Sequence, residues 1–278
     1  MKIDAHQHFW KYDSHEYPWI DDVKAALRRD YLPADLVREQ TPLGYDGSIV
    51  VQARQTLEET RWLLELAEND PRIHGVVGWV DLQSSAVREQ LATFAKHPKL
   101  LGVRHVVQDE PDDNFMLRPE FLRGIATLTE FGLVYDVLIF PKQLPAAIEL
   151  ARRFPAQPFV LDHIAKPFIK DRIFTPWTEL IRELAACSNV HCKISGMVTE
   201  ADWHGWQSAD FTPYLDVVLE AFGPSRLMIG SDWPVCLLAA DYRKTMKLAE
   251  DYFARLTPAE QGKIFGANAL DFYRRRMG

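Results

Sequence analysis

Short apolar runs alternate with longer amphipathic stretches along most of the chain. Each run is too short for a helix and rich in Val and Ile, as expected of strands that are buried on both faces of a parallel sheet. The eight runs span residues 2–8, 47–53, 74–80, 100–107, 133–140, 159–164, 189–195 and 226–232. Between them, apolar residues recur at intervals of three and four, which predicts helices at residues 56–69, 141–154 and 176–187, with Pro176 as a first helical residue.

Eight strand and helix units spread over the whole chain predict one closed (β/α)8 barrel of the TIM type, a single domain over residues 1–278. An open doubly wound sheet is the main alternative, but no run is followed by a Gly-rich phosphate-binding turn. Residues 258–275, capped by Thr257, are expected to form a closing helix. The long connections at residues 9–46 and 196–210 should both lie at the carboxyl end of the barrel, where active sites form.

Composition and charge narrow the class of protein. The 278 residues are 47% hydrophobic and 26% charged, which is ordinary globular usage. The net charge of −7, without a basic stripe, argues against nucleic acid as a partner. Neither a signal peptide nor a run of 18 apolar residues is present, so we expect a cytoplasmic protein that does not contact membranes. Three cysteines without a CxxC pattern indicate reduced, packed thiols.

Two histidines end the first predicted strand. His6 and His8 are one residue apart, so the period of two along a strand places both imidazoles on the same face. Two neutral imidazoles that converge on one point can bind a divalent cation or polarise a carbonyl. Because strands of a barrel end at its catalytic face, this position favours a functional pair.

His163 and Asp232 end the sixth and eighth predicted strands. A polar side chain buried in the mouth of a barrel must be hydrogen-bonded or paired, so each alone could be structural. Together with His6 and His8 they surround one expected pocket. We therefore interpret the four residues as candidate catalytic and metal-binding groups.

Side chains alternate between the two faces of a strand, and this alternation predicts which of the other polar residues near the strand ends point into the barrel. Arg104 is expected to enter the barrel and His105 to point outward, so that the Arg104 guanidinium could hold a carboxylate or the oxygens of a polyol. Gln52 could bind a substrate hydroxyl. Asp162 precedes His163 and is expected to point to the opposite, helix-facing side. Lys166 lies beyond the strand end and could approach the site or cap a neighbouring helix, and we expect the helix cap.

Ordered motifs along the whole chain resemble the amidohydrolase superfamily. They are IDAHQHFW, VQA, GVRHVVQ, FVLDHIAKP, KISG, RLMIGSDWP and FGANALDFY. Within the superfamily the sequence is similar to the branch that contains L-fuconolactonases and L-rhamnonolactonases, together with 2-pyrone-4,6-dicarboxylate lactonase. The resemblance implies hydrolysis of an aldonolactone, such as L-fuconolactone or L-rhamnonolactone, to the free sugar acid.

The resemblance also implies roles for single residues. The first-strand His pair of the family falls on His6 and His8, its late-strand His on His163 and its aspartate on Asp232. Two-metal members add a bridging Lys or Glu and a further His, but the corresponding strand ends here carry Arg104, Asp136 and residues 193–195. We therefore expect at most one cation, Zn²⁺, bound by His6, His8, His163 and Asp232. Turnover should depend on it weakly or not at all.

The expected mechanism assigns Asp232 as the general base that activates water for attack on the lactone carbonyl. The three imidazoles would orient the water or stabilise the oxyanion, and the donor of the second proton stays open. No GxSxG motif offers a covalent nucleophile. A metal-dependent nonoxidative decarboxylase and a sugar-acid binding protein without turnover stay open as alternatives. The sequence also leaves the ring size and the oligomeric state open, a homo-oligomer included.

Overall fold

The centre of the molecule is an eight-stranded parallel sheet in the order β1 to β8, as seen in the computed structural model, which describes residues 1–274. The strands are β1 (Ile3–Gln7), β2 (Gly47–Val51), β3 (Ile73–Gly78), β4 (Leu100–His105), β5 (Val134–Val137), β6 (Phe159–Leu161), β7 (Val190–Ile194) and β8 (Leu227–Ile229). Each lies within or overlaps a predicted run. The backbone N–H of Asp232 donates to His6 O at 2.8 Å, and that of His8 donates to Trp233 O at 2.7 Å, which joins the first strand to the segment after the last. The predicted (β/α)8 barrel is confirmed.

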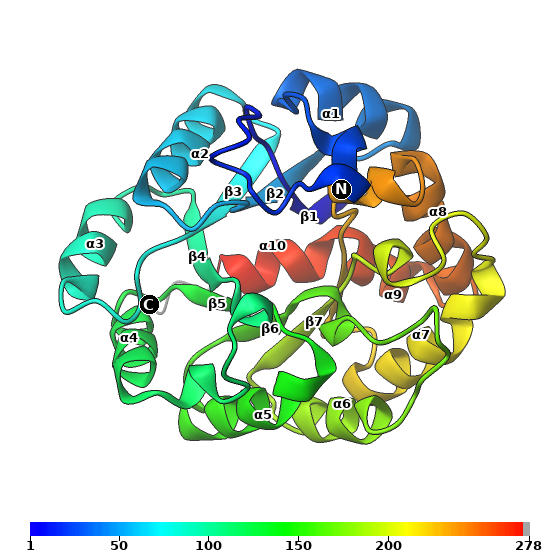
Figure 1. Ribbon diagram of the computed structural model, residues 1–278. Helices are drawn as coiled ribbons and strands as arrows, with labels where there is room; N and C mark the ends of the chain where they lie inside the picture. Colours follow the sequence, from blue (N-terminus) through cyan, green and yellow to red (C-terminus); the bar gives the residue numbers. More distant parts are fainter. Residues whose placement is uncertain (275–278) are drawn as a thin grey trace.

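Helices surround this barrel (Figure 1). They are α1 (Pro33–Gln40), α2 (Leu57–Asn69), α3 (Val87–Phe94), α4 (Pro119–Glu130), α5 (Leu144–Arg153), α6 (Trp177–Ala185), α7 (Ser208–Phe222), α8 (Tyr242–Phe253) and α9 (Pro258–Gly262), whereas α10 (Asn268–Tyr273) lies across the middle of the barrel (Figure 1). Pro176 precedes α6 as its N-cap residue, so its predicted place inside the helix is wrong by one position. Among residues 1–274, no helix combines the length and apolar character needed to cross a membrane.

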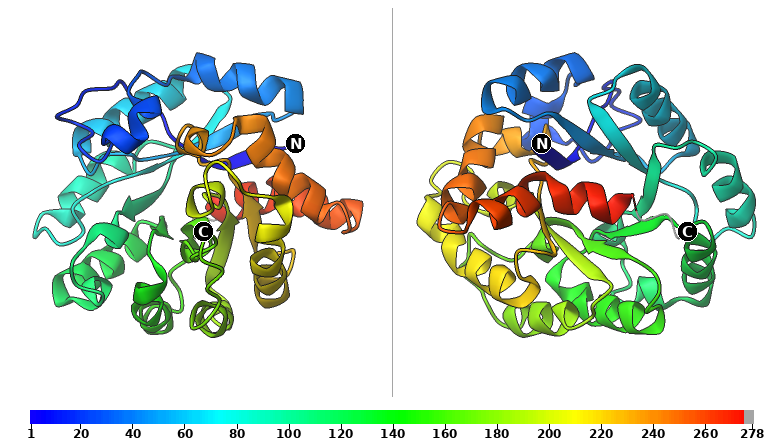
Figure 2. Two further views of the ribbon diagram at one scale, coloured as in Figure 1. Left: turned by 45° about the vertical axis from the view of Figure 1, so that its right-hand side comes forward. Right: turned by 180° about the vertical axis from the view of Figure 1, so that it is seen from behind.

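The predicted closing helix at residues 258–275 is interrupted. Thr257 caps α9 as expected, accepting from the Glu260 backbone N–H while the Glu260 carboxylate accepts in return. A π-helical turn at Lys263–Ala267 then separates α9 from α10, and residue 275 lies outside the described residues. After this interruption α10 runs across the middle of the barrel, as the right-hand view of Figure 2, seen from behind, shows in red.

The barrel interior is filled by apolar side chains below the site. Residues of β1, β2, β3, β4, β5, β6 and β8 form one buried cluster with Phe272 and Tyr273 of α10. Inward-facing branched side chains in layers are the usual filling of such barrels. The polar strand ends are therefore confined to the opposite, carboxyl end.

The first long connection, residues 9–46, is attached to that carboxyl end by aromatic rings. Trp10 packs edge-on against Tyr31 at 5.4 Å, and Tyr31 against Trp233 at 5.2 Å. Trp233 directly follows Asp232, so the connection is fixed to the segment that carries this carboxylate. Edge-to-face ring pairs contribute about 0.5–1.5 kcal/mol each beyond their burial.

Candidate active site

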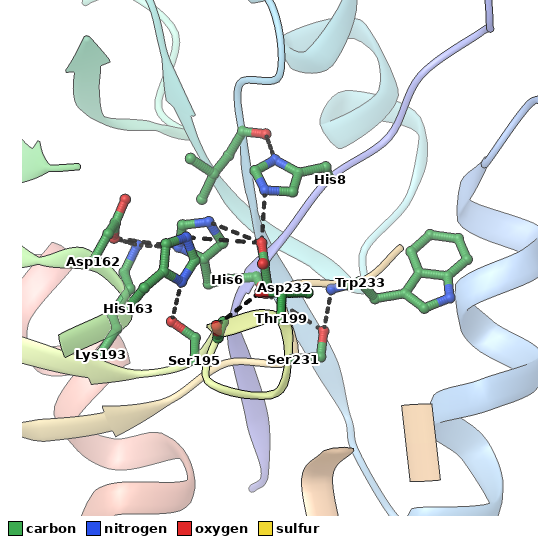
Figure 3. Close-up of polar contacts among 12 residues, drawn as sticks. His6, His8, Asp162, His163, Lys193, Ser195, Thr199, Ser231, Asp232 and Trp233 are labelled. Atoms are coloured by element: carbon green, nitrogen blue, oxygen red, sulfur yellow. Dashed lines mark hydrogen bonds and ion pairs between the residues drawn. The ribbon is translucent and has the colours of Figure 1, made fainter. Parts of the chain in front are cut away.

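Three imidazoles converge on the carboxylate of Asp232 at the carboxyl end of the barrel (Figure 3). Asp232 Oδ1 lies 3.2 Å from His8 Nε2, 3.8 Å from His6 Nε2 and 3.8 Å from His163 Nε2. All four side chains are buried. The four residues that the sequence singled out are thus brought together in one site.

His6 and His8 reach this point from the end of β1. The pairing of β1 with β2 shifts register between Asp4 and Gln7, which marks a β-bulge. A bulge lets two consecutive residues face the same side, so Ala5 lies in the apolar interior while His6 and His8 both face Asp232. The prediction that the two imidazoles share a face is confirmed.

The segment after β6 turns with a left-handed backbone. Four consecutive residues, His163 to Lys166, have φ angles of 53°, 48°, 60° and 48°. This conformation costs about 1–2 kcal/mol per non-glycine residue, and for β-branched Ile164 it is a clear outlier. Strain of this kind persists only where the surrounding fold imposes it, and it is concentrated at functional sites.

This turn explains why one orientation predicted from the sequence is wrong. Asp162 was expected on the helix-facing side because a strand would alternate it with His163. Instead β6 ends at Leu161, and the turn aims both neighbours into the barrel. Asp162 is fully buried there and pairs with the Arg104 guanidinium at 3.2 Å.

The ring of His163 is held by the loop after β7. Its Nδ1 lies 2.9 Å from the hydroxyl oxygen of Ser195. The next residue, Gly196, has a φ of +61°, and a Cβ at that position would lie 2.4 Å from His163 Nδ1. Only glycine therefore lets the loop approach the imidazole so closely.

His8 is oriented by a backbone carbonyl, Val51 O, at 2.7 Å from its Nδ1. A carbonyl oxygen can only accept, so Nδ1 carries its proton. His8 Nε2 then faces Asp232 Oδ1 at 3.2 Å. Two acceptors at this distance repel each other unless a positive charge lies between them, either a second proton on Nε2 or a metal cation.

A buried charge network lies beneath the imidazoles. Lys193 Nζ is 2.5 Å from Asp136 Oδ2, 3.0 Å from Asp162 Oδ1 and 3.1 Å from His6 Nδ1. The hydroxyl of Tyr273 in α10 donates to the Asp136 carboxylate at 2.9 Å. The network therefore connects the site to the helix that closes the far end of the barrel.

Arg104 enters the barrel as predicted, while His105 stacks on Phe115 outside it, with ring centroids 4.8 Å apart. The Arg104 guanidinium donates to Asp162 and, at 3.0 Å, to the Gln52 side-chain oxygen. Gln52 is thus bound to Arg104. That either residue also binds substrate stays a prediction.

Burial determines the protonation of the site. It lowers the pKa of His6 and of His163 well below the ordinary 6.5, and the Lys193 ammonium lowers the pKa of His6 further. Burial alone would raise the pKa of Asp232, but His163 and His8 outweigh it and hold that pKa below its usual 3.8. At neutral pH, His6 and His163 are neutral and Asp232 is ionised.

A cavity of about 710 Å³ opens above this centre. Its wall includes His8, Arg104, His163 and Asp232, together with residues of both long connections. The cations on the wall are paired with carboxylates: Lys24 with Asp21, Arg54 with Glu16, Arg104 with Asp162 and Lys166 with Glu200. The cavity therefore combines polar groups of both signs and suits a small neutral polar molecule.

Sequence reasoning missed several residues of the site. Lys193 could have been identified from the sequence, because a lysine within an apolar strand run must have a buried partner. Lys166 was expected to cap a helix but lies on the cavity wall, since the left-handed turn redirects it. Glu200, in the loop after β7, gave no signal in the sequence.

Comparisons with known proteins agree with this geometry. The chain is 44% identical to an L-fucono-1,5-lactonase of Burkholderia multivorans over 98% of its length and 96% of the relative. It is 40% identical to an L-fucono-1,5-lactonase of Burkholderia ambifaria, over 99% and 96% of the two chains. A crystal structure of a Burkholderia multivorans amidohydrolase with bound zinc superimposes with a TM-score of 0.94 at 44% identity, covering 98% of this chain and 99% of that one.

The same likeness extends along nearly the whole sequence. The amidohydrolase family model matches residues 3–275, a range that runs from β1 past α10 and includes all four groups of the site. The high identity to the relatives above covers the same range. The chain therefore belongs to the amidohydrolase family.

Proposed function

We propose that this protein is a lactonase that hydrolyses a neutral sugar lactone to the free sugar acid. The observation that carries the proposal is the convergence of three imidazoles on the buried, ionised Asp232 at the floor of a polar cavity. The relatives named L-fucono-1,5-lactonase support an aldonolactone as the substrate class. A 27% identical L-rhamnono-gamma-lactonase of Scheffersomyces stipitis, matched over 62% of this chain, supports the same class.

Asp232 acts as the general base in this account. Its contacts to the three imidazoles, within the described part of the chain, all use Oδ1, so Oδ2 is available to a water molecule. Oδ2 takes a proton from the water while the water oxygen attacks the lactone carbonyl carbon. The carbonyl oxygen becomes the tetrahedral oxyanion, which the imidazole N–H groups of the site stabilise.

Collapse of the tetrahedral intermediate breaks the bond between the carbonyl carbon and the ring oxygen. The departing oxygen must receive a proton, and His8 is the group placed to give it. With Nδ1 bound to Val51 O, a proton on His8 Nε2 points at the reacting centre. The product is the ring-opened acid, and the proton held by Asp232 returns to His8, whose Nε2 faces that carboxylate at 3.2 Å, so both groups are restored.

The donor set also fits one zinc ion. Ligand atoms of His6, His8 and Asp232 lie within 4.8 Å of one another, and His163 Nε2 lies 3.8 Å from Asp232 Oδ1. Imidazole nitrogens and carboxylates are preferred ligands of Zn²⁺, and a cation would also relieve the His8 and Asp232 repulsion. When bound, zinc would supply a Lewis acid at this point. A related crystal structure contains bound zinc, which supports zinc as the cation.

We expect turnover to depend weakly on that ion. An ester carbonyl is intrinsically reactive, and Arg104 and Lys193 already supply buried positive charge next to His6. Chelation, confirmed by elemental analysis, should leave most of the initial rate. A fall below about a hundredth of the rate, restored by stoichiometric zinc, would assign the Lewis-acid role to the metal instead.

The proposal is tested by a panel of 1,4- and 1,5-aldonolactones, with hydrolysis followed by proton release in a pH-indicator assay. A neutral sugar lactone should be turned over faster than a pyrone dicarboxylate, because the wall cations already have carboxylate partners. Release of CO₂ from an aromatic acid would support a decarboxylase instead. Ligand that is bound but recovered intact would indicate a binding protein.

A further inference from the structure

Two charged side chains on the cavity wall take no part in the proposed activation of water. Lys166 ends the left-handed turn after β6, and Glu200 lies in the connection after β7. Their side chains are 17% and 19% exposed, and both line the cavity that holds His163 and Asp232. Long charged side chains on a surface are usually far more exposed. The fold therefore holds an ammonium and a carboxylate against the cavity.

The contact between these two groups leaves most of their hydrogen-bonding capacity unused. Lys166 Nζ and Glu200 Oε1 are 3.8 Å apart, too far for a hydrogen bond. The other contact found for the ammonium within residues 1–274 is the Phe140 ring, 5.6 Å from Nζ to the centroid. An ammonium has three donors and a carboxylate about four acceptor sites. A ligand in the cavity can use them.

We propose that Lys166 and Glu200 bind the ring hydroxyls of the lactone and thereby select polyhydroxylated substrates. The inference rests on the proposed lactonase function and adds two substrate-binding residues to it. Adjacent hydroxyls can accept from the ammonium and donate to the carboxylate at the same time. The opposite charges nearly cancel, so a neutral polyol is favoured over an ion of either sign.

The left-handed turn connects this recognition to the reacting centre. Lys166 N–H donates to His163 O at 2.8 Å, so both residues belong to one tight turn. The same turn therefore places an imidazole at Asp232 and an ammonium on the wall. A lactone held by its hydroxyls at Lys166 and Glu200 is kept next to the group that activates water.

The test compares two lactones with the same ring size, an aldono-1,5-lactone and the hydroxyl-free δ-valerolactone. Lys166→Met and Glu200→Gln should each lower kcat/KM for the sugar lactone by about 10- to 100-fold, the value of a hydrogen bond to a charged group. Activity on δ-valerolactone should change less than about threefold, because that substrate makes no such bond. The Ki of the free sugar acid should rise in both variants, and that of 5-hydroxypentanoate should not.

Lys11→Met is the matched control. Lys11 lies in the first long connection but is exposed and does not line the cavity, so both substrates should keep wild-type rates. Circular dichroism and thermal unfolding verify the fold of each variant. Should Lys166→Met not fold, Lys166→Gln and Glu200→Gln make the same comparison.

Equal losses on both lactones, or an unchanged kcat/KM for the sugar lactone, would overturn the inference while leaving the lactonase proposal intact. If the turnover of δ-valerolactone is too slow to detect, the two Ki values are compared instead. Equal changes in the Ki of the free sugar acid and in that of 5-hydroxypentanoate would overturn the inference. A wild-type enzyme that hydrolyses no lactone at all would contradict the proposed function itself.

Discussion

Asp232 remains a carboxylate in a buried site because of the imidazoles around it. Removing an ionised carboxyl from water is costly, and burial by itself raises its pKa. Here His163 and the hydrogen-bonded His8 more than compensate, so the pKa lies below its usual value. The base is thus ready to accept a proton at neutral pH, at the expense of some intrinsic basicity.

The pH dependence of the reaction follows from these shifts. The pKa values of Asp232, His6 and His163 are all lowered, so none of these groups gains a proton as the pH falls from 8 to 6.5. We therefore expect the acid limb of kcat/KM, measured by product quantification in buffered solution, to have its midpoint below 6.5. A midpoint above 6.5 would show that an imidazole titrates normally in the free enzyme.

Gly196 offers a test of how His163 is positioned. Gly196→Ala would place a Cβ 2.4 Å from His163 Nδ1, so the ring must move. A displacement of this size should lower kcat/KM by about 10²-fold. Gly223→Ala is the control, because Gly223 also has a positive φ, +65°, but nothing lies within 4 Å of its added Cβ.

Both alanine variants should lose about 1 kcal/mol of unfolding free energy from backbone strain, measured by urea titration. Only Gly196→Ala should also lose activity. Similar kcat/KM values for the two variants would contradict the positioning role.

At the scale of elements, the sequence predicted regular geometry and missed irregular geometry. The period of two placed His6 and His8 on one face, and that expectation holds. The same rule failed at Asp162, because no pattern of apolar residues marks a left-handed turn of four non-glycine residues. The partners of Lys193 come from β5 and from the turn after β6, so they depend on strand order, which became known only with the assembled barrel.

The buried network on β7 should contribute strongly to stability. Lys193→Met would leave Asp136 and Asp162 with less compensating charge inside the barrel, and breaking a buried pair costs about 3–5 kcal/mol. Tyr273→Phe removes only one hydroxyl contact with Asp136 and should cost about 1 kcal/mol. Equilibrium urea unfolding measures both, and a cost for Lys193→Met no larger than that for Tyr273→Phe would contradict this role.

At the scale of the whole molecule, one end of the barrel provides stability and the other end carries the active site. Apolar side chains and α10 fill one end of the barrel, while strand ends and long connections build the site at the other. The sequence predicted the barrel from its eight units and the long connections from their lengths. It did not predict that the closing segment would break at the π-helical turn and cross the barrel, since a helical pattern alone does not reveal a tertiary bend.

Limited proteolysis tests whether the chain behaves as one domain, as its eight linker-free units predict. Digestion under native conditions, followed by mass spectrometry, should leave one core that contains all eight strands. Two stable fragments of comparable size, cut between β4 and β5, would instead indicate two independent halves.

The central claim is that Asp232 activates water for lactone hydrolysis, and the variant Asp232→Asn tests it most directly. The substitution keeps the size of the side chain and removes the base, so kcat/KM for the best aldonolactone should fall by about 10²- to 10⁴-fold. The rate must be corrected for spontaneous hydrolysis, and circular dichroism should show an unchanged fold. A correctly folded Asp232→Asn enzyme that keeps more than about a tenth of the wild-type kcat/KM would show that another group is the base.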